Sequence, residues 1–137
     1  MDALSKERRS EVMRGIGRQN TPPERAVRRI LHKIRCRFRI HPKNLPGKPD
    51  VVLPRWKTVV FVHGCFWHGC PRCYQGHRVP KTNRAYWLAK VERNQARDRR
   101  VAQELADAGW RVVVVWECEA GDESLLEDRL LRLFPRG

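Results

Sequence analysis

Residues 63–73 read His-Gly-Cys-Phe-Trp-His-Gly-Cys-Pro-Arg-Cys and bring three thiols, two imidazoles and two aromatic rings into one short loop. Packing alone needs far fewer reactive groups in such a segment. Thiolates and imidazoles at this density favour a bound metal ion, and a histidine that is not a ligand is available for proton transfer. The adjacent rings of Phe66 and Trp67, in an otherwise polar loop, favour stacking on a flat partner.

The cysteine spacing predicts a zinc site. Three thiols follow the pattern Cys-x4-Cys-x2-Cys at Cys65, Cys70 and Cys73. Cys118 follows a valine-rich run and supplies a fourth ligand if that run lies beside the strand that precedes the loop. Four thiolates select zinc, and a site closed by four protein ligands holds the loop in shape instead of activating water. His77 could replace Cys118, and the alternative for the whole set is ordinary buried cysteines.

A second group of residues could carry catalysis. Asp50 follows a Pro-Gly-Lys-Pro turn and begins an apolar run, which would place its carboxylate at a sheet edge where Mg²⁺ can bind with most of its waters. His63 ends the next apolar run, and His68 lies five residues further on. Each residue alone is explained as well by a turn or loop position. Two imidazoles beside one carboxylate favour proton transfer near neutral pH.

The composition indicates a polyanionic partner. The chain has 137 residues, with 29 Lys and Arg against 15 Asp and Glu, and a formal net charge of +14. Nucleic acid is the leading candidate because each phosphate contact releases condensed counterions. A hydrophobic content of 41% favours a folded domain over a basic tail.

No segment approaches a membrane span and the first residues do not resemble a signal peptide, so we expect a cytoplasmic protein with no membrane contact. In that compartment the five cysteines are reduced thiols, and a cluster of them indicates metal ligation before it indicates disulfides. Four thiols can close a tetrahedral site, which leaves Cys36 as a small core residue.

The first part of the chain is predicted to hold an arm, a helix and three strands. Residues 1–20 have too little apolar content for a core and are expected to form a basic DNA-binding arm, with residues 21–137 as a single domain. The sequence Thr-Pro-Pro-Glu at 21–24 is a capping box that opens an amphipathic helix. Three strands follow as an antiparallel meander, over residues 37–40, 50–53 and 58–62.

The second part alternates helix, strand and helix. Residues 84–108 are predicted as one long helix that Gly109 ends. The run over residues 111–116 is apolar on both faces, which is typical of a strand buried inside a sheet, and its place after a helix predicts parallel pairing with an earlier strand. A last helix is expected over residues 123–134. The order αβββαβα predicts an α/β fold with a mixed sheet flanked by helices.

Several stretches of the sequence resemble one known family. They are Leu-Pro-Gly-Lys-Pro-Asp at 45–50, Phe-Val-His-Gly-Cys-Phe-Trp-His at 61–68, Arg-Asp-Arg-Arg at 97–100, and Gly-Trp-Arg-Val and Val-Trp-Glu-Cys between 109 and 118. On these motifs nearly the whole chain resembles the very-short-patch (Vsr) mismatch repair endonucleases. The resemblance implies a restriction-endonuclease-like core that binds double-stranded DNA at T·G mismatches left by deamination of 5-methylcytosine. It also implies a nick on the 5′ side of the thymine, with catalytic Mg²⁺ and structural zinc.

The resemblance implies roles for individual residues. Asp50 and the backbone carbonyl of Val62 would hold the magnesium ion, and His68 would be the general base on the attacking water. The family usually has Thr at the position of Val62, but a carbonyl ligand does not depend on the side chain. The family also usually has a histidine at the position of Cys70, so four thiolates are expected here in place of three thiolates and an imidazole.

His63, hydrogen-bonded to Glu24, would handle a proton near the leaving oxygen. Asp98 on the long helix would orient waters or an imidazole. The alternatives are that Glu24 is only a capping residue and that Asp98 is only a salt-bridged helix residue. The chain lacks the Glu-x-Lys motif of many restriction-like nucleases, and histidine chemistry is expected to replace that lysine.

Phe66, Trp67 and Trp87 resemble an aromatic wedge inserted beside the mismatch from the major groove, and Met13 and Ile16 resemble residues of an arm that enters from the other groove. Inserting a wedge costs a few kcal/mol of base stacking, and a wobble pair is cheaper to open than a normal pair. For Trp87, on a helical apolar stripe, core burial is the alternative.

The implied protein is a monomer that acts on DNA in the bacterial cytoplasm, near the nucleoid, with mismatch-repair proteins as candidate partners. Two other classes of function stay open. One is a zinc-stabilised DNA-binding module without catalysis. The other is a restriction-type or homing-type endonuclease that cuts both strands of a matched site.

Overall fold

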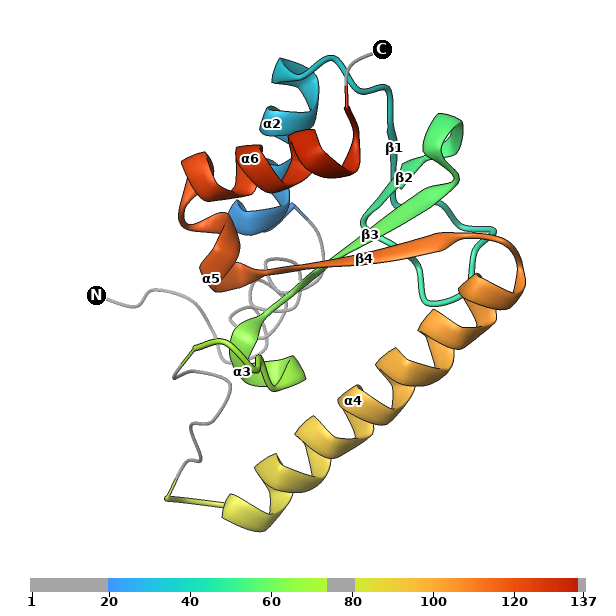
Figure 1. Ribbon diagram of the computed structural model, residues 1–137. Helices are drawn as coiled ribbons and strands as arrows, with labels where there is room; N and C mark the ends of the chain where they lie inside the picture. Colours follow the sequence, from blue (N-terminus) through green and yellow to red (C-terminus); the bar gives the residue numbers. More distant parts are fainter. Residues whose placement is uncertain (1–19, 74–80, 136–137) are drawn as a thin grey trace, which may run out of the picture.

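The computed structural model describes residues 20–73 and 81–135, which form a four-stranded sheet with helices on both faces (Figure 1). In chain order the elements are α2 (Pro22–Lys33), β1 (Arg39–Ile40), β2 (Val51–Leu53), the 3₁₀ helix η1 (Pro54–Trp56), β3 (Thr58–His63), α3 (Cys65–His68), α4 (Arg84–Asp107), β4 (Arg111–Trp116), α5 (Glu117–Ala120) and α6 (Glu123–Leu133). The expectations for the arm, with Met13 and Ile16, and for His77 as a ligand concern residues outside the described ranges.

The sheet is mixed, with the strand order β1-β2-β3-β4. β1 pairs with β2, and β2 with β3, in antiparallel fashion, so the predicted meander is confirmed. β4 pairs with β3 in parallel, from Thr58 opposite Arg111 to His63 opposite Trp116, as its place after a helix predicted. A parallel connection must return the chain along the length of the strands, and α4 makes most of that return (Figure 1).

Two strand predictions are wrong in part. The strand expected over residues 37–40 is reduced to the two exposed residues of β1. The valine run of β4 was expected inside the sheet, but in the described part of the chain β4 is an edge strand that pairs with β3. Its two faces are apolar because helices cover both: Val113 and Val115 belong to one core cluster, and Val112 packs against the other.

The core consists of two clusters on opposite faces of the sheet. Successive residues of a strand point to opposite faces, so Val60 joins the cluster with α2 and α6, whereas Val59 joins the cluster with α4. Figure 1 shows this arrangement, with α2 and α6 on one side of the strands and α4 on the other. Cys36, expected as a small core residue, is partly buried and packs against the first cluster.

The capping residues of α2 also shape the site. Thr21 is the N-cap, and its hydroxyl accepts a hydrogen bond of 3.4 Å from the Glu24 backbone N–H. The predicted capping box is half confirmed, because the Glu24 carboxylate accepts the reciprocal bond from the N–H of Asn20 (3.0 Å) and not from that of Thr21. Prolines at the first two helical positions fit a turn whose N–H groups have no helical partner.

The long helix α4 is only partly a core helix. Val101 and Leu105 are its buried residues, whereas Leu88 in its first half is 46% exposed. Its first half therefore extends beyond the sheet towards α3 (Figure 1). The helix ends as predicted before Gly109, which has a φ of +91°. In the described part of the chain, no helix combines the length and apolar character that a membrane span needs.

Gly47 lets the turn over residues 45–49 approach α4. Its φ is +72°, and an added Cβ would lie 2.2 Å from Cγ1 of Val101. We expect Gly47→Ala to lower the free energy of unfolding by about 2 to 4 kcal/mol, because it combines left-handed strain with a core clash. Denaturant unfolding measures the change, with Gly64→Ala as the control, since a Cβ there meets Trp67 at an ordinary 3.6 Å. Equal midpoints for the two variants would contradict the expectation.

Candidate active site and thiolate cluster

A cleft of about 720 Å³ lies between the start of α2, the start of β2, the end of β3, and helices α3 and α4. It is lined by all five residues predicted to be catalytic, namely Glu24, Asp50, His63, His68 and Asp98. The sequence separates these residues by up to 74 positions, so only the tertiary fold brings them together. Asp50 and His68 therefore open onto the same space, as one shared phosphate would require.

Asp50 is fixed at the start of β2. Its Oδ2 accepts a 2.6 Å hydrogen bond from the N–H of Val62, and its own N–H donates to the carbonyl of Val60. Burial raises the pKa of Asp50 to about 7; the Val62 N–H opposes this rise, and the neighbouring carboxylate of Glu24 adds to it. Two carboxylates held together away from water are an arrangement that a divalent cation would stabilise.

The predicted hydrogen bond between His63 and Glu24 is wrong. Glu24, only 3% exposed, instead bonds to Nε2 of His41 at 3.1 Å. One ligand atom each of Glu24, His41 and Asp50 lie within 4.8 Å of one another. The sequence motifs did not point to His41. The predicted antiparallel pairing of the first two strands could have done so, because the register that sets Ile40 opposite Val51 also brings His41 to Asp50. The N–H of His41 donates to the Asp50 carbonyl.

The two predicted catalytic histidines lie against each other and share one carboxylate. The rings of His63 and His68 are stacked, with centroids 4.0 Å apart and planes 5° apart. Asp98 Oδ2 is 2.6 Å from Nδ1 of His68, and Asp98 Oδ1 is 3.9 Å from Nε2 of His63. Because the carboxylate bonds Nδ1 of His68, that nitrogen carries a proton and Nε2 is left as the basic position.

The charges of this triad follow from its surroundings. Burial, together with the neighbouring His68, lowers the pKa of His63 to about 4, against the opposing effect of Asp98, so His63 is neutral at pH 7. Burial alone would raise the pKa of Asp98. The hydrogen bond and charge of His68 outweigh burial and hold that pKa below its usual value. The expectation that Asp98 orients an imidazole agrees with this geometry.

An aromatic cluster extends outward from the rim of the cleft, which Phe66 and Trp67 line. Trp67 packs against Phe66 and Trp87 with ring centroids 5.1 Å away in both cases, and Tyr86 packs on Trp87 at 5.0 Å. Trp87 is half-buried in this cluster and does not belong to either core cluster, which disfavours the alternative of plain core burial. Trp67 is 40% exposed and Tyr86 is 52% exposed. The sequence analysis did not include Tyr86 in the aromatic wedge, although Tyr86 directly precedes Trp87 in the sequence.

The loop that carries these groups is partly helical, which the sequence did not predict. Residues 65–68 form α3, a single turn that contains Phe66, Trp67 and His68. Side chains of α4 hold its last carbonyls: Asn94 donates to the Trp67 carbonyl (2.9 Å) and Gln95 to the His68 carbonyl (3.3 Å). Such a short helix has little stability of its own, so α4 fixes its position.

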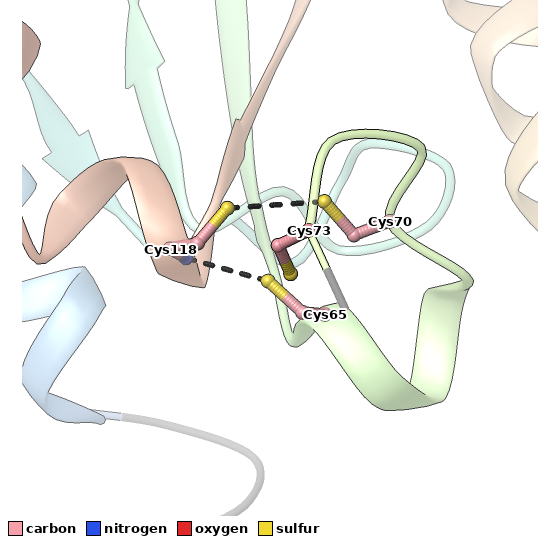
Figure 2. Close-up of side chains that lie close together, drawn as sticks. All are labelled: Cys65, Cys70, Cys73 and Cys118. Atoms are coloured by element: carbon pink, nitrogen blue, oxygen red, sulfur yellow. Dashed lines mark hydrogen bonds between the residues drawn. The ribbon is translucent and has the colours of Figure 1, made fainter. Parts of the chain in front are cut away.

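The four cysteines predicted as ligands meet beside α3. The sulfur atoms of Cys65, Cys70, Cys73 and Cys118 all lie within 4.8 Å of one another and point towards a common space (Figure 2). Cys118 comes from α5, directly after β4, so the parallel pairing of β3 and β4 brings it to Cys65. The predicted cluster is therefore formed, with Cys118 in the fourth position.

The geometry of the cluster fits a zinc ion. The sulfurs of Cys70 and Cys118 are 3.8 Å apart. A tetrahedron with a metal–sulfur distance of about 2.3 Å has an edge of about 3.8 Å. Backbone N–H groups of Cys118 and Arg72 donate to the sulfurs of Cys65 and Cys70 at 3.3 Å, which stabilises thiolates. Burial raises the pKa of the Cys65 and Cys118 thiols, so a metal ion must displace their protons when it binds.

The fold is similar to that of a solved nuclease domain. The catalytic domain of the homing endonuclease I-Bth0305I superposes with a TM-score of 0.57 and 21% sequence identity, over 84% of this chain and 95% of that one. This likeness defines the fold alone. A strongly basic chain with an acidic, histidine-containing cleft has the features of an enzyme that acts on nucleic acid.

Residues 1–75 match the family model described as DNA mismatch endonuclease Vsr. The chain is 53% identical to the type II nicking enzyme V.XorIIP of Xanthomonas oryzae pv. oryzae, over 97% of this chain and 96% of that protein. It is 39% identical to the DNA mismatch endonuclease Vsr of Escherichia coli, over 95% of this chain and 82% of that protein. The protein belongs to the Vsr family of DNA endonucleases, as the sequence motifs predicted.

The thiolate cluster predicts one zinc ion per chain. Cys118→Ser should lower the zinc content, because it removes one of four soft ligands, and it should lower the melting temperature towards that of chelator-treated wild type. Elemental analysis and thermal unfolding measure both effects. Cys36→Ser is the matched control, since Cys36 lies outside the cluster and should leave the zinc content unchanged. Wild-type protein without zinc, or full zinc retention in Cys118→Ser, would contradict the assignment.

The raised pKa of Asp50 predicts a pH-dependent gain in stability for Asp50→Asn. The folded protein binds the Asp50 proton more tightly than the unfolded chain, so the stability of the wild type falls as pH rises from 3.8 to about 7. In Mg²⁺-free buffer we expect the variant to exceed the wild type by about 1 to 4 kcal/mol above pH 7, and by almost nothing near pH 4.

Chemical denaturation at several pH values measures this difference. Mg²⁺ should stabilise the wild type and leave Asp50→Asn unaffected. Asp107→Asn, on the exposed end of α4, serves as the control and should show no pH-dependent gain. A gain for Asp50→Asn that is equal at pH 4 and pH 8 would show that the carboxylate is not destabilised by burial.

Proposed function

We propose that the protein nicks the thymine strand of double-stranded DNA on the 5′ side of T in T·G mismatches, by Mg²⁺-dependent hydrolysis. The observation that carries the proposal is the cleft itself, where Asp50 and His68 face one space whose rim bears exposed aromatic rings. The relatives named as nicking enzymes and as mismatch endonucleases support the reaction and the substrate class.

Asp50 and the carbonyl of Val62 would hold the magnesium ion, with Glu24 as a second carboxylate beside them. When bound, Mg²⁺ supplies positive charge that stabilises the phosphate in the transition state. The chain holds the site ready through the Val62 N–H, which fixes one oxygen of Asp50, and through His41, which fixes Glu24. The pKa of Asp50 is raised because the Val62 N–H and Arg28 do not offset the effect of burial on the charged carboxylate, so a bound cation would stabilise that charge.

His68 would take the proton of the attacking water. Asp98 holds its Nδ1 at 2.6 Å, keeps the ring in one orientation and stabilises the imidazolium that proton transfer produces. The neutral ring of His63, stacked on His68, would donate a hydrogen bond towards the leaving oxygen. One carboxylate therefore serves both imidazoles, and a substitution at Asp98 would disturb both.

The aromatic rim would recognise the mismatch by stacking. A T·G wobble pair is cheaper to unstack than a normal pair, so rings such as Trp67 can separate it from its neighbours at lower cost. A zinc ion in the thiolate cluster would keep α3 in place while DNA pushes against it. One such cleft per monomer accounts for a cut in one strand. The proposal includes action in the bacterial cytoplasm and contact with mismatch-repair proteins.

One other function has an observation in its favour. The structural similarity to a homing endonuclease catalytic domain is compatible with cleavage of both strands at a matched site. The two functions differ in substrate and product. A matched duplex with the same flanking sequence therefore distinguishes them.

A 5′-labelled duplex with a single T·G pair should be nicked beside the T in the presence of Mg²⁺. His68→Ala should slow nicking by at least about 100-fold, the range for loss of a catalytic proton-transfer group. Asp50→Ala should abolish nicking, because it removes the proposed side-chain ligand of the magnesium ion. Gel analysis of both strands measures the products, and thermal unfolding and zinc content show that each variant is folded. Intact strands with folded wild type would refute the proposal, and double-strand breaks in the matched duplex would favour the homing-type alternative.

A further inference from the structure

A second hollow, of about 790 Å³, lies between α2 and β1. Four arginines line it: Arg25 and Arg28 on α2, and Arg37 and Arg39 at β1. Its remaining described lining includes the rings and alkyl groups of residues such as Phe38 and Ile40, and it contains no carboxylate. We call this hollow the arginine groove.

The arginine groove adjoins the catalytic cleft. Arg25 follows Glu24 directly, and Ile40 precedes His41, whose ring bonds the Glu24 carboxylate. Burial raises the pKa of Asp50, and the positive charge of Arg28 acts against that rise, so this guanidinium is close enough to affect the cleft. The first turns of α2 thus form a wall shared by the groove and the cleft, with Glu24 lining the cleft and Arg25 lining the groove.

The charges of the groove lack partners within the described residues, whereas those on the other side of α2 are neutralised. Arg29 and Lys33 form ion pairs with Glu123 and Glu127 of α6. No described carboxylate pairs with the arginines of the groove, and Nη1 of Arg28 is buried without a hydrogen-bond partner among the described residues. Like charges gathered in one hollow repel one another until an anion enters.

We propose that the arginine groove binds the sugar-phosphate backbone of the DNA arm that leaves the catalytic cleft over α2. Guanidinium groups match phosphate oxygens in geometry and charge, and continuity with the cleft makes the flank of the same duplex the nearest polyanion. This inference rests on the proposed function. It concerns DNA affinity and position, because none of the four arginines lines the cleft where the chemistry would occur.

The test compares two variants that lose the same charge. Arg25→Gln/Arg37→Gln removes two cations from the groove, and Arg29→Gln/Lys33→Gln removes two paired cations from the opposite side of the same helix. At 0.15 M salt, the groove variant should bind a T·G duplex on the order of tenfold more weakly than the control, as loss of two phosphate contacts implies. The slope of log K against log salt should decrease by about 1.8 for the groove variant only.

Duplexes with one shortened arm show where the groove binds. Removing the arm that lies over α2 should weaken binding by the wild type and the control more than binding by the groove variant, which keeps only Arg28 and Arg39 of the four arginines. Removing the other arm should weaken all three equally. Thermal unfolding confirms that each variant is folded, and Arg37→Gln/Arg39→Gln tests the groove from the β1 side if the first variant is unstable.

The outcomes separate this inference from the proposed function. If wild type nicks T·G duplexes while the groove and control variants share one affinity and one salt slope, the groove inference is overturned and the nicking proposal stands. The groove would then face a different polyanion, such as an acidic protein segment. If the wild type neither binds nor nicks mismatched DNA, the proposed function is wrong, and the proposal that the groove binds DNA is wrong as well.

Discussion

The parallel pairing of β3 with β4 is the constraint on which both candidate sites depend. Six residue pairs set the two strands in register, so their carboxyl ends meet at one edge of the sheet. At that edge β3 leads into α3 and β4 into α5, which brings Cys65 to Cys118 and places His63 beside the ring of Trp116. A parallel pair needs a long return connection, and the helix that provides it, α4, carries Asp98 to the two histidines.

Electrostatics act in opposite directions in the two halves of the cleft. Asp98 lies beside two stacked imidazoles, whose interactions outweigh burial and lower its pKa. Burial raises the pKa of Asp50 to about 7, and the neighbouring carboxylate of Glu24 adds to the rise. Asp98 is therefore charged at neutral pH, as the proposed partner of a base must be, whereas burial destabilises the charge of Asp50, which the proposed cation would stabilise. Environment alone separates the tasks of two chemically identical groups.

Much of the fold and of the site could be predicted from local patterns. Capping residues and helical spacing predicted α2, α4 and α6, and cysteine spacing predicted the thiolate cluster. The short helices α3 and α5 were missed because four residues give no periodicity. The edge position of β4 was missed because helices on both faces make a strand as apolar as neighbouring strands would. The hydrogen bond between Glu24 and His41 depends on the register in which β1 pairs with β2, and the sequence pattern of either strand alone does not determine that register.

The order of residues in α3 has a mechanical consequence. Phe66, Trp67 and His68 are consecutive on one turn of helix. Side chains of α4 donate hydrogen bonds to the last two carbonyls of that turn. The backbone that carries the two rings and the imidazole is therefore fixed to α4 as one unit. Under the proposed function, a base step that resists insertion and tilts this turn would also carry the imidazole away from the water that it is proposed to activate. Discrimination between base pairs would then be exerted on the rate of cutting, even where two duplexes bind with equal strength.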